Sequence, residues 1–97
     1  MSITAYHFWS PTCAPCNAIK PSIEDLKEEF PSIIWVSVNT HDDKEGISSK
    51  YGVTVVPTIA IEVFDNDKFI SLEKHSGTNI AGYYRIIRSG LRTIKQL

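Results

Sequence analysis

The first half of the chain shows two hydrophobic patterns, one typical of strands and one typical of a helix. Residues 3–9 are rich in β-branched and aromatic side chains and end at Ser10-Pro11, which predicts a strand. From Cys13 to Phe30 the apolar residues recur at helical spacing with polar residues between them, which predicts an amphipathic helix. Residues 33–39 are almost continuously apolar, as in a strand whose two faces are both covered.

The second half predicts a short helix, a hairpin and a long helix. Residues 40–51 are polar, and we expect a short helix near their end with Gly52 as its stop. Residues 58–64 and 69–76 are predicted strands, joined by the turn Asp65-Asn66-Asp67. Asn79 suits the N-cap of a final helix. That helix would bury the apolar residues of its inner side, which are Tyr83, Ile87, Leu91 and Ile94.

The resulting element order, β-α-β-α-β-β-α, predicts the fold class. Because helical connections join the first three strands, we expect these strands to be parallel, with the hairpin adding an antiparallel fourth. The expected architecture is an α/β fold with a four-stranded mixed sheet and helices on both faces. Residues 1–97 would form a single domain, because 97 residues hold one modest core and no linker or repeat divides them.

Composition changes this picture little. Hydrophobic residues make up 42% of the chain and charged residues 22%, as in ordinary globular proteins. No apolar run reaches the length of about eighteen residues that a transmembrane helix needs. No basic stretch followed by an apolar one marks a signal peptide, so we expect a cytoplasmic protein. A net charge of −1 gives no reason to expect nucleic acid as a partner.

Charge is unevenly placed along the chain. No acid follows Glu73, and the last predicted helix carries four cations at helical spacing: Arg85, Arg88, Arg92 and Lys95. One interpretation is a basic stripe that docks an acidic partner or nucleic acid. The other is a solvated helix face, where late cations are favoured by the helix dipole. Both interpretations are open at this point.

The two cysteines, Cys13 and Cys16, lie three residues apart. A loop this small barely stabilises a fold, and a disulfide-rich scaffold would need more cysteines. Cys13 falls where the first strand has ended and the helix begins, where free N–H groups and the helix dipole favour a thiolate. Cys16 lies one turn further on the same side, so it can attack a mixed disulfide formed at Cys13. Pro15 fits the first helical turn.

Three stretches resemble parts of the thioredoxin family. Residues 8–16 (Phe-Trp-Ser-Pro-Thr-Cys-Ala-Pro-Cys), with Pro21 in the following helix, resemble its active-site segment. Residues 50–53 (Lys-Tyr-Gly-Val) and 56–58 (Val-Pro-Thr) resemble the stretch that leads to its cis-proline. Gly77 resembles the glycine after its last strand. A lone C-x-x-C would be a weak signal, but this combination is specific.

The resemblance implies a thioredoxin fold and a protein-disulfide reductase that works by dithiol–disulfide exchange. It implies that Cys13 attacks, that Cys16 resolves, and that Pro57 follows a cis peptide bond facing the dithiol. The residues expected to bind substrate are Trp9, Thr12, Ala14, Pro15, Val56 and Gly77. No cofactor is expected beyond the redox-active Cys13–Cys16 disulfide. The expected partners are disulfide-bearing proteins and a thioredoxin reductase or similar electron donor, with no membrane and a monomeric state.

The chain departs from this family in two respects. Thioredoxins begin with an extra strand and helix that we do not find here, so we expect a short form with four strands. His7 stands where the family carries a buried aspartate behind the resolving cysteine, and Ser37 or Val38 stands where a lysine commonly accompanies it. His7 would act as a catalytic proton relay, since its unperturbed pKa lies near neutrality. The alternative is a neutral core histidine.

Other functions stay open from the sequence. A glutaredoxin-like, glutathione-dependent oxidoreductase suits the short core, but the paired glycines near its last helix are missing, and residues 77–79 are Gly-Thr-Asn. Zinc would need two further ligands, and His7, His41 and His75 are scattered singly, so we expect no metal. A third possibility is a partner-binding module on a thioredoxin fold.

Overall fold

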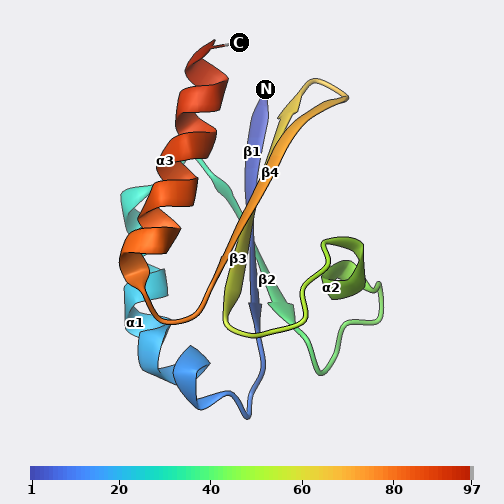
Figure 1. The fold of residues 1–97 in the computed structure, drawn as a ribbon. Helices are drawn as coiled ribbons and strands as arrows, with labels where there is room; N and C mark the ends of the chain where they lie inside the picture. The colour runs from blue at the N-terminus through green and yellow to red at the C-terminus, as the bar shows by residue number, and fades with distance from the viewer. Residues whose placement is uncertain (97) are drawn as a thin grey trace.

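The computed structural model describes residues 1–96 and contains every predicted element. The order is β1 (Ser2–Trp9), α1 (Ala14–Glu29), β2 (Ile34–Asn39), α2 (Ile47–Lys50), β3 (Thr58–Asp65), β4 (Lys68–Ser76) and α3 (Ile80–Gln96). Figure 1 shows α1 and α3 on one side of the sheet and α2 on the other. The expected α/β fold, with helices on both faces of a mixed sheet, is therefore confirmed.

The strand directions differ from the prediction in one place. The four-stranded sheet has the order β2-β1-β3-β4. β1 and β2 are parallel, but β3 runs antiparallel to β1, so the expectation that the first three strands are parallel is wrong for β3. The reason is the length of α2, whose four residues rise by only about 6 Å. The chain therefore stays at the end of the sheet where β2 finishes, and Thr58 begins β3 opposite Phe8.

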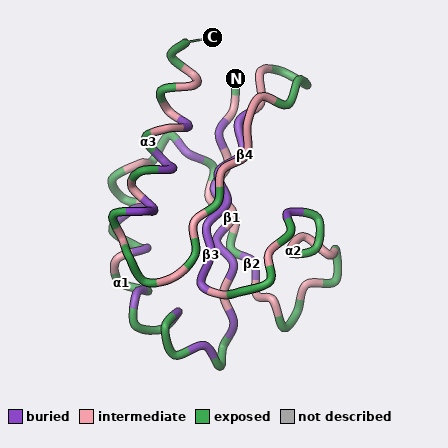
Figure 2. Tube along the Cα trace, in the orientation of Figure 1, coloured by how far each residue is buried: buried purple, intermediate pink, exposed green. Residues whose placement is uncertain are grey.

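Two apolar cores lie on the two faces of the sheet, and side-chain alternation along β1 explains them. Ile3 and Ala5 face α1 and α3 and belong to the larger core, whereas Phe8 faces α2 and belongs to the smaller one. Figure 2 shows the buried residues concentrated on the central strands and on the inner sides of the two long helices. This arrangement makes β1 the central support of the segment that follows it, which carries both cysteines.

The inner side of α3 packs closely on the sheet. Tyr83 and Ile87 are fully buried as predicted, while Leu91 and Ile94 are half-buried at the margin of the core. A Cβ atom on Gly90 would lie 2.8 Å from the side chain of Ile3, so only glycine permits this approach. None of the helices in the described residues is long and apolar enough to cross a membrane.

Candidate active site: a dithiol between a loop wall and a cavity

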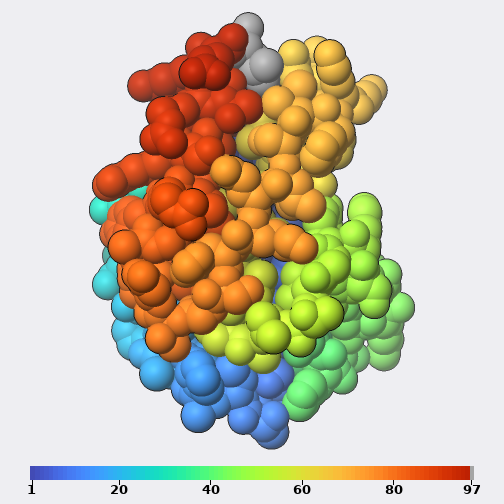
Figure 3. Space-filling view, viewed as in Figure 1, coloured from blue at the N-terminus to red at the C-terminus, as the bar shows by residue number. Residues whose placement is uncertain are grey.

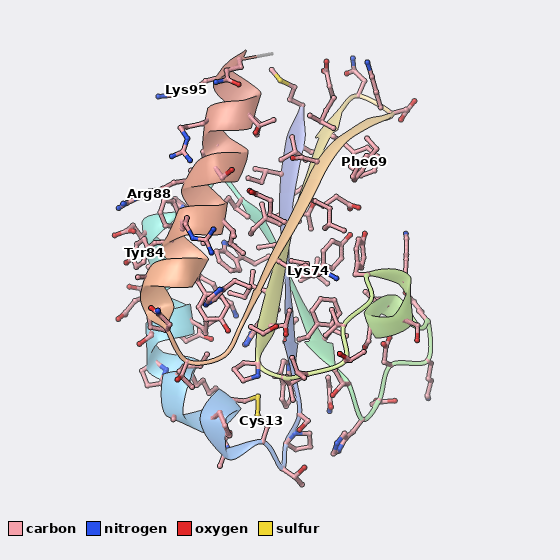
Figure 4. All side chains as sticks on the ribbon, in the orientation of Figure 1. Cys13, Phe69, Lys74, Tyr84, Arg88 and Lys95 are labelled. Atoms are coloured by element: carbon pink, nitrogen blue, oxygen red, sulfur yellow. A yellow bond between two sulfur atoms is a disulfide. The ribbon has the colours of Figure 1, made fainter. Side chains whose placement is uncertain are left out.

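Cys13 and Cys16 form a disulfide at the start of α1, at the lower end of the molecule in Figure 4. Cys13 is the N-cap residue of the helix, and its Sγ accepts a hydrogen bond from the backbone N–H of Cys16 at 3.1 Å. The Cα atoms lie 5.2 Å apart. The expected placement of Cys13 at the helix start is confirmed. Its sulfur therefore lies where free N–H groups and the helix dipole stabilise a thiolate.

Cys13 is 9% exposed, and its immediate neighbours in the chain lie at the surface. Thr12, Ala14 and Pro15 are all exposed, and Pro15 occupies the first turn of α1. Cys16 is only 5% exposed and points into the protein. A partner sulfur can therefore approach from the side of Cys13, while Cys16 lies behind it.

The loop before β3 forms a wall at the same end of the sheet. The peptide bond between Val56 and Pro57 is cis, as expected. Because Thr58 pairs with Phe8, Pro57 lies where β1 leads into the dithiol segment. The carbonyl of Pro57 accepts a hydrogen bond from the N–H of Gly77 at 3.0 Å. Gly77 has a φ of +102°, a region that favours glycine.

Sequence reasoning missed a hydroxyl that ties this wall together. The Tyr83 hydroxyl, on α3, donates to the carbonyl of Gly77 at 2.5 Å and lies 3.3 Å from the carbonyl of Pro57. Burial raises the pKa of Tyr83 to about 12, so the hydroxyl stays protonated and remains a donor. The sequence placed Tyr83 among the apolar residues of the helix. The signal was the residue type itself, since a buried tyrosine hydroxyl needs a hydrogen-bond partner.

A second hydroxyl pair fixes the same loop. Thr58 Oγ1 donates to the carbonyl of Val55 at 2.7 Å and lies 2.7 Å from Ser76 Oγ. Since a hydroxyl has one hydrogen, Ser76 must donate to Thr58. The loop before β3 and the turn after β4 are therefore joined by side chains as well as by backbone.

A cavity of about 190 Å³ lies on the other side of the dithiol. Its lining comes from β1, β2 and α1 and consists of His7, Trp9, Cys16, Asn17, Lys20, Glu24, Lys27 and Ser37. Trp9, expected in the substrate groove, thus lines the cavity beside Cys16, and its Nε1 donates to Ser37 Oγ at 2.7 Å. Ser37 is the residue paired with His7, whereas Val38 belongs to the opposite core.

The cations of this cavity were also missed, although the spacing of α1 contained the signal. Lys20, Glu24 and Lys27 follow Cys16 at helical spacing and share its side of the helix. Lys27 and Glu24 form an ion pair with an N–O distance of 3.3 Å. The mouth of the cavity therefore carries both signs of charge.

His7 is the buried polar group of this cavity. It is 8% exposed, and its Nε2 atom has no hydrogen-bond partner among the described residues. Burial, reinforced by the positive charge of Lys27 and opposed by Glu24, lowers the pKa of His7 from 6.5 to about 4. The imidazole is therefore neutral at neutral pH and is a weaker base than an exposed histidine.

The other two histidines lie elsewhere. His75 packs edge-on against the Tyr83 ring with 4.8 Å between centroids, and His41 follows β2 in an exposed turn. Within residues 1–96, no group of three or more histidine, cysteine or acidic side chains is arranged to hold a metal ion.

Comparisons with known proteins bear on this geometry. The family described as Thioredoxin matches residues 3–83. The thioredoxin of Pyropia yezoensis is 37% identical over 54 residues, which are 56% of this chain and 50% of that protein. The chloroplastic M-type thioredoxin of Zea mays is 40% identical over 55 residues, 56% of this chain and 32% of that protein. The chain thus matches half or less of the length of these curated relatives.

Solved structures match a larger part of this chain than the curated sequences do. The X-ray structure of Fasciola hepatica thioredoxin superposes with a TM-score of 0.76 at 26% identity, covering 92% of this chain and 81% of that one. The short form of thioredoxin f from spinach chloroplasts superposes with a TM-score of 0.75 at 20% identity, covering 92% of this chain and 76% of that one, which shows a shared fold.

Proposed function

Because this chain belongs to the thioredoxin family, we propose that it reduces disulfides in proteins by dithiol–disulfide exchange at Cys13 and Cys16. The observation that carries this proposal is the position of Cys13 as N-cap of α1, bonded to Cys16 one turn further on. Such a helix start lowers the pKa of a thiol and so supplies the nucleophile for exchange.

The first step takes place at Cys13. The thiolate of Cys13 attacks one sulfur of the substrate disulfide, a new S–S bond joins Cys13 to the substrate, and the other substrate sulfur leaves as a thiolate. The exposed neighbours of Cys13 and the wall formed by the loop before β3 would bind the substrate chain around this bond. We assign that binding role to Thr12, Ala14, Pro15, Val56 and Gly77, with Pro57 beside the reacting sulfurs. Trp9, which lines the cavity beside Cys16, would contact the substrate from that side.

The second step takes place at Cys16. Its thiol loses a proton, attacks the sulfur of Cys13, and releases the second substrate sulfur as a thiolate. The Cys13–Cys16 disulfide forms, and the substrate disulfide has gained two electrons. This step needs a proton acceptor on the buried side of the dithiol, because Cys16 does not face open solvent.

We assign to His7 the role of accepting the proton that the Cys16 thiol loses. Its place in the cavity beside Cys16 and its Nε2 atom, which no described protein group contacts by a hydrogen bond, support the role. The lowered pKa makes His7 a weaker base than an exposed histidine, so it would hold the proton only briefly before passing it on. The cavity is large enough for water, which can carry the proton between the two side chains.

The electron donor and the compartment are part of the same proposal. A thioredoxin reductase or a similar enzyme would return two electrons to the Cys13–Cys16 disulfide. One structural relative comes from a complex of ferredoxin:thioredoxin reductase with thioredoxin f2, which favours an enzyme donor of this class. We place the protein in the cytoplasm, because protein thiols are kept reduced in that compartment and the dithiol must be re-reduced after each turnover.

The test is reduction of a disulfide in a model protein, run in two parallel arms. One arm supplies NADPH and a thioredoxin reductase, and the other supplies glutathione and its reductase. The Cys13→Ser/Cys16→Ser double variant is the control in both. Turnover in the first arm supports the proposal. Turnover in the glutathione arm alone favours the glutaredoxin-like function, and no turnover in either arm would overturn the proposal in favour of a binding role.

A further inference from the structure

The outer side of α3 carries a row of cations. Arg85, Arg88 and Arg92, here called the arginine stripe, are exposed and recur at helical spacing, and Lys95 continues the row. Figure 4 shows Tyr84, Arg88 and Lys95 on the side of α3 that faces away from the sheet. Figure 3 shows α3 at the surface along its whole length. The stripe is therefore accessible to a partner.

The arginine stripe borders a hollow in the surface. This open groove of about 540 Å³ lies between α3 and the end of α1, and Ala81, Tyr84 and Glu29 complete its lining. Ala81 has the smallest side chain of the lining. The surface thus has a shape that a partner element can enter.

One arginine of the stripe is held in place by aromatic contacts. The guanidinium carbon of Arg88 lies 5.2 Å from the centroid of the Tyr84 ring, and that ring packs edge-on against Phe30 at 6.0 Å. A cation over an aromatic face is stabilised there. Arg88 is thereby ordered before any partner binds, which lowers the entropy that binding must overcome.

The charge of the stripe is not neutralised by its own helix. α3 contains no aspartate or glutamate. Across the described part of the chain, the one ion pair within 4.0 Å joins Lys27 and Glu24, both on α1. Like charges three or four residues apart destabilise a helix. An anionic partner would remove this repulsion.

We propose that the arginine stripe docks an acidic helix of a protein partner. Carboxylates at positions i, i+3 and i+7 of a helix repeat the spacing of Arg85, Arg88 and Arg92. Each guanidinium group can take a carboxylate in a two-pronged geometry. A helix lying in a groove is a common mode of peptide recognition.

The opposite rim of the groove argues against nucleic acid. Glu29 lines the groove, and the exposed Asp25 and Glu28 follow the same stretch of α1. Burial together with the charges of Glu29 and Asp25 raises the pKa of Tyr84, which places both acids near the groove. A continuous phosphate backbone would meet these acids along its length. A helix can instead turn its acids to α3 and its neutral or basic residues to α1.

The groove lies apart from the dithiol, so a docked partner leaves Cys13 open. The lining residues of the groove include neither cysteine. Docking can therefore be measured on the oxidised protein, whether or not the proposed disulfide reduction holds.

The experiment measures binding of a fluorescently labelled helical peptide by anisotropy. The peptide carries glutamate at i, i+3 and i+7, and its matched control carries glutamine at the same places. At low salt the oxidised full chain should bind the glutamate peptide at least tenfold more tightly than the control. The difference should shrink at physiological ionic strength, because salt screens exposed charges.

Two double variants with equal loss of charge locate the site. Arg85→Gln/Arg92→Gln keeps Arg88 on Tyr84 and should weaken binding at least fivefold, while Lys44→Gln/Lys68→Gln, at exposed lysines outside the groove, should leave binding unchanged. Circular dichroism confirms that both variants fold. Equal affinity for the two peptides, or equal losses in the two variants, would overturn the proposal. So would tighter binding of an oligodeoxynucleotide of equal charge through the same arginines.

Discussion

The two sides of the dithiol follow the family pattern to different extents. On the loop side, Cys13 caps α1, and the loop at Pro57 is held by the backbone of Gly77. On the cavity side, His7 and Ser37 are paired across β1 and β2, at positions where the resemblance implies an acid and a lysine. The side that receives a substrate sulfur is therefore conventional, and the side that handles the proton of Cys16 is not.

The difference between the loop side and the cavity side shows which step of the reaction depends on the backbone and which depends on a single side chain. A helix N-terminus activates Cys13 through N–H groups that any sequence supplies. Proton transfer to or from Cys16 depends on one side chain with a suitable pKa, so that role can pass to another residue type. We expect changes at the sulfurs to abolish the reaction and changes in the cavity to slow one step of it.

The largest effect should come from the cysteines themselves. Cys13→Ser should lower the rate of protein-disulfide reduction by about a thousandfold or more, because no other nucleophile is present at the helix start. In the Cys16→Ser variant, Cys13 should still attack the substrate disulfide, but the reaction should stop at the mixed disulfide. Mass spectrometry of the substrate adduct checks this difference. An adduct that accumulates on Cys16 in the Cys13→Ser variant would reverse the two assigned roles.

The next effect concerns stability on the cavity side. The pKa of His7 is about 4 in the folded protein against 6.5 for an unperturbed histidine. Between these values the unfolded chain binds more protons than the folded one, so the free energy of unfolding rises with pH across this window. This contribution is fully present above pH 6.5 and is lost as the pH falls towards 4. It amounts to about 3 kcal/mol.

Denaturant unfolding between pH 4 and pH 7 measures that contribution. His7→Gln removes the titrating group and should flatten the pH dependence relative to the unchanged protein. Carboxylates titrate at the lower end of the same window, so the difference between the two proteins is the quantity to compare. Identical slopes would show that His7 is not held neutral by burial.

A smaller kinetic effect should separate the two steps of exchange. His7→Ala should slow the release of substrate from the mixed disulfide by about tenfold at neutral pH, because Cys16 loses its proton acceptor. Formation of the mixed disulfide at Cys13 should keep its rate. Single-turnover kinetics with a chromogenic disulfide resolves both steps, and the melting temperature reports whether the protein remains folded. Equal slowing of both steps would assign His7 a purely structural role.

Local features of the loop side could be predicted from the sequence. The placement of Cys13 at a helix start follows from a strand pattern that ends at Ser10-Pro11 and a helical pattern that begins directly afterwards. The cis bond before Pro57 is implied by the resemblance of residues 50–53 and 56–58 to the thioredoxin family. Each of these features could be assigned from a short stretch of the chain, the first by its pattern and the second by its family resemblance.

Features that depend on distant segments could not be predicted. The direction of β3 depends on where the connection after β2 ends, and periodicity does not encode that. The hydroxyl of Tyr83 meets the carbonyl of Pro57 across 26 positions, and the indole of Trp9 meets Ser37 across 28. A sequence pattern shows that Tyr83 is buried in a helix, but it does not show which backbone atoms its hydroxyl reaches.

The smallest predicted effect tests the loop side through that hydroxyl. Tyr83→Phe keeps the buried ring and removes the donor to the Gly77 carbonyl, while the Pro57 carbonyl keeps the N–H of Gly77. The free energy of unfolding should fall by about 1 kcal/mol. The KM for a protein disulfide should rise by about threefold, because a loosened wall holds an extended chain less well. The rate with a small aromatic disulfide should not change.

Tyr84→Phe on the outer side of α3 is the matched control, since its hydroxyl does not touch the wall, and steady-state kinetics with both substrates checks the outcome. Loss of activity towards the small disulfide as well would mean that Tyr83 supports the dithiol itself rather than the wall. In that case the two sides of the dithiol would share one support through α3. The contrast between a loop side that receives the substrate and a cavity side that handles the proton of Cys16 would then no longer hold.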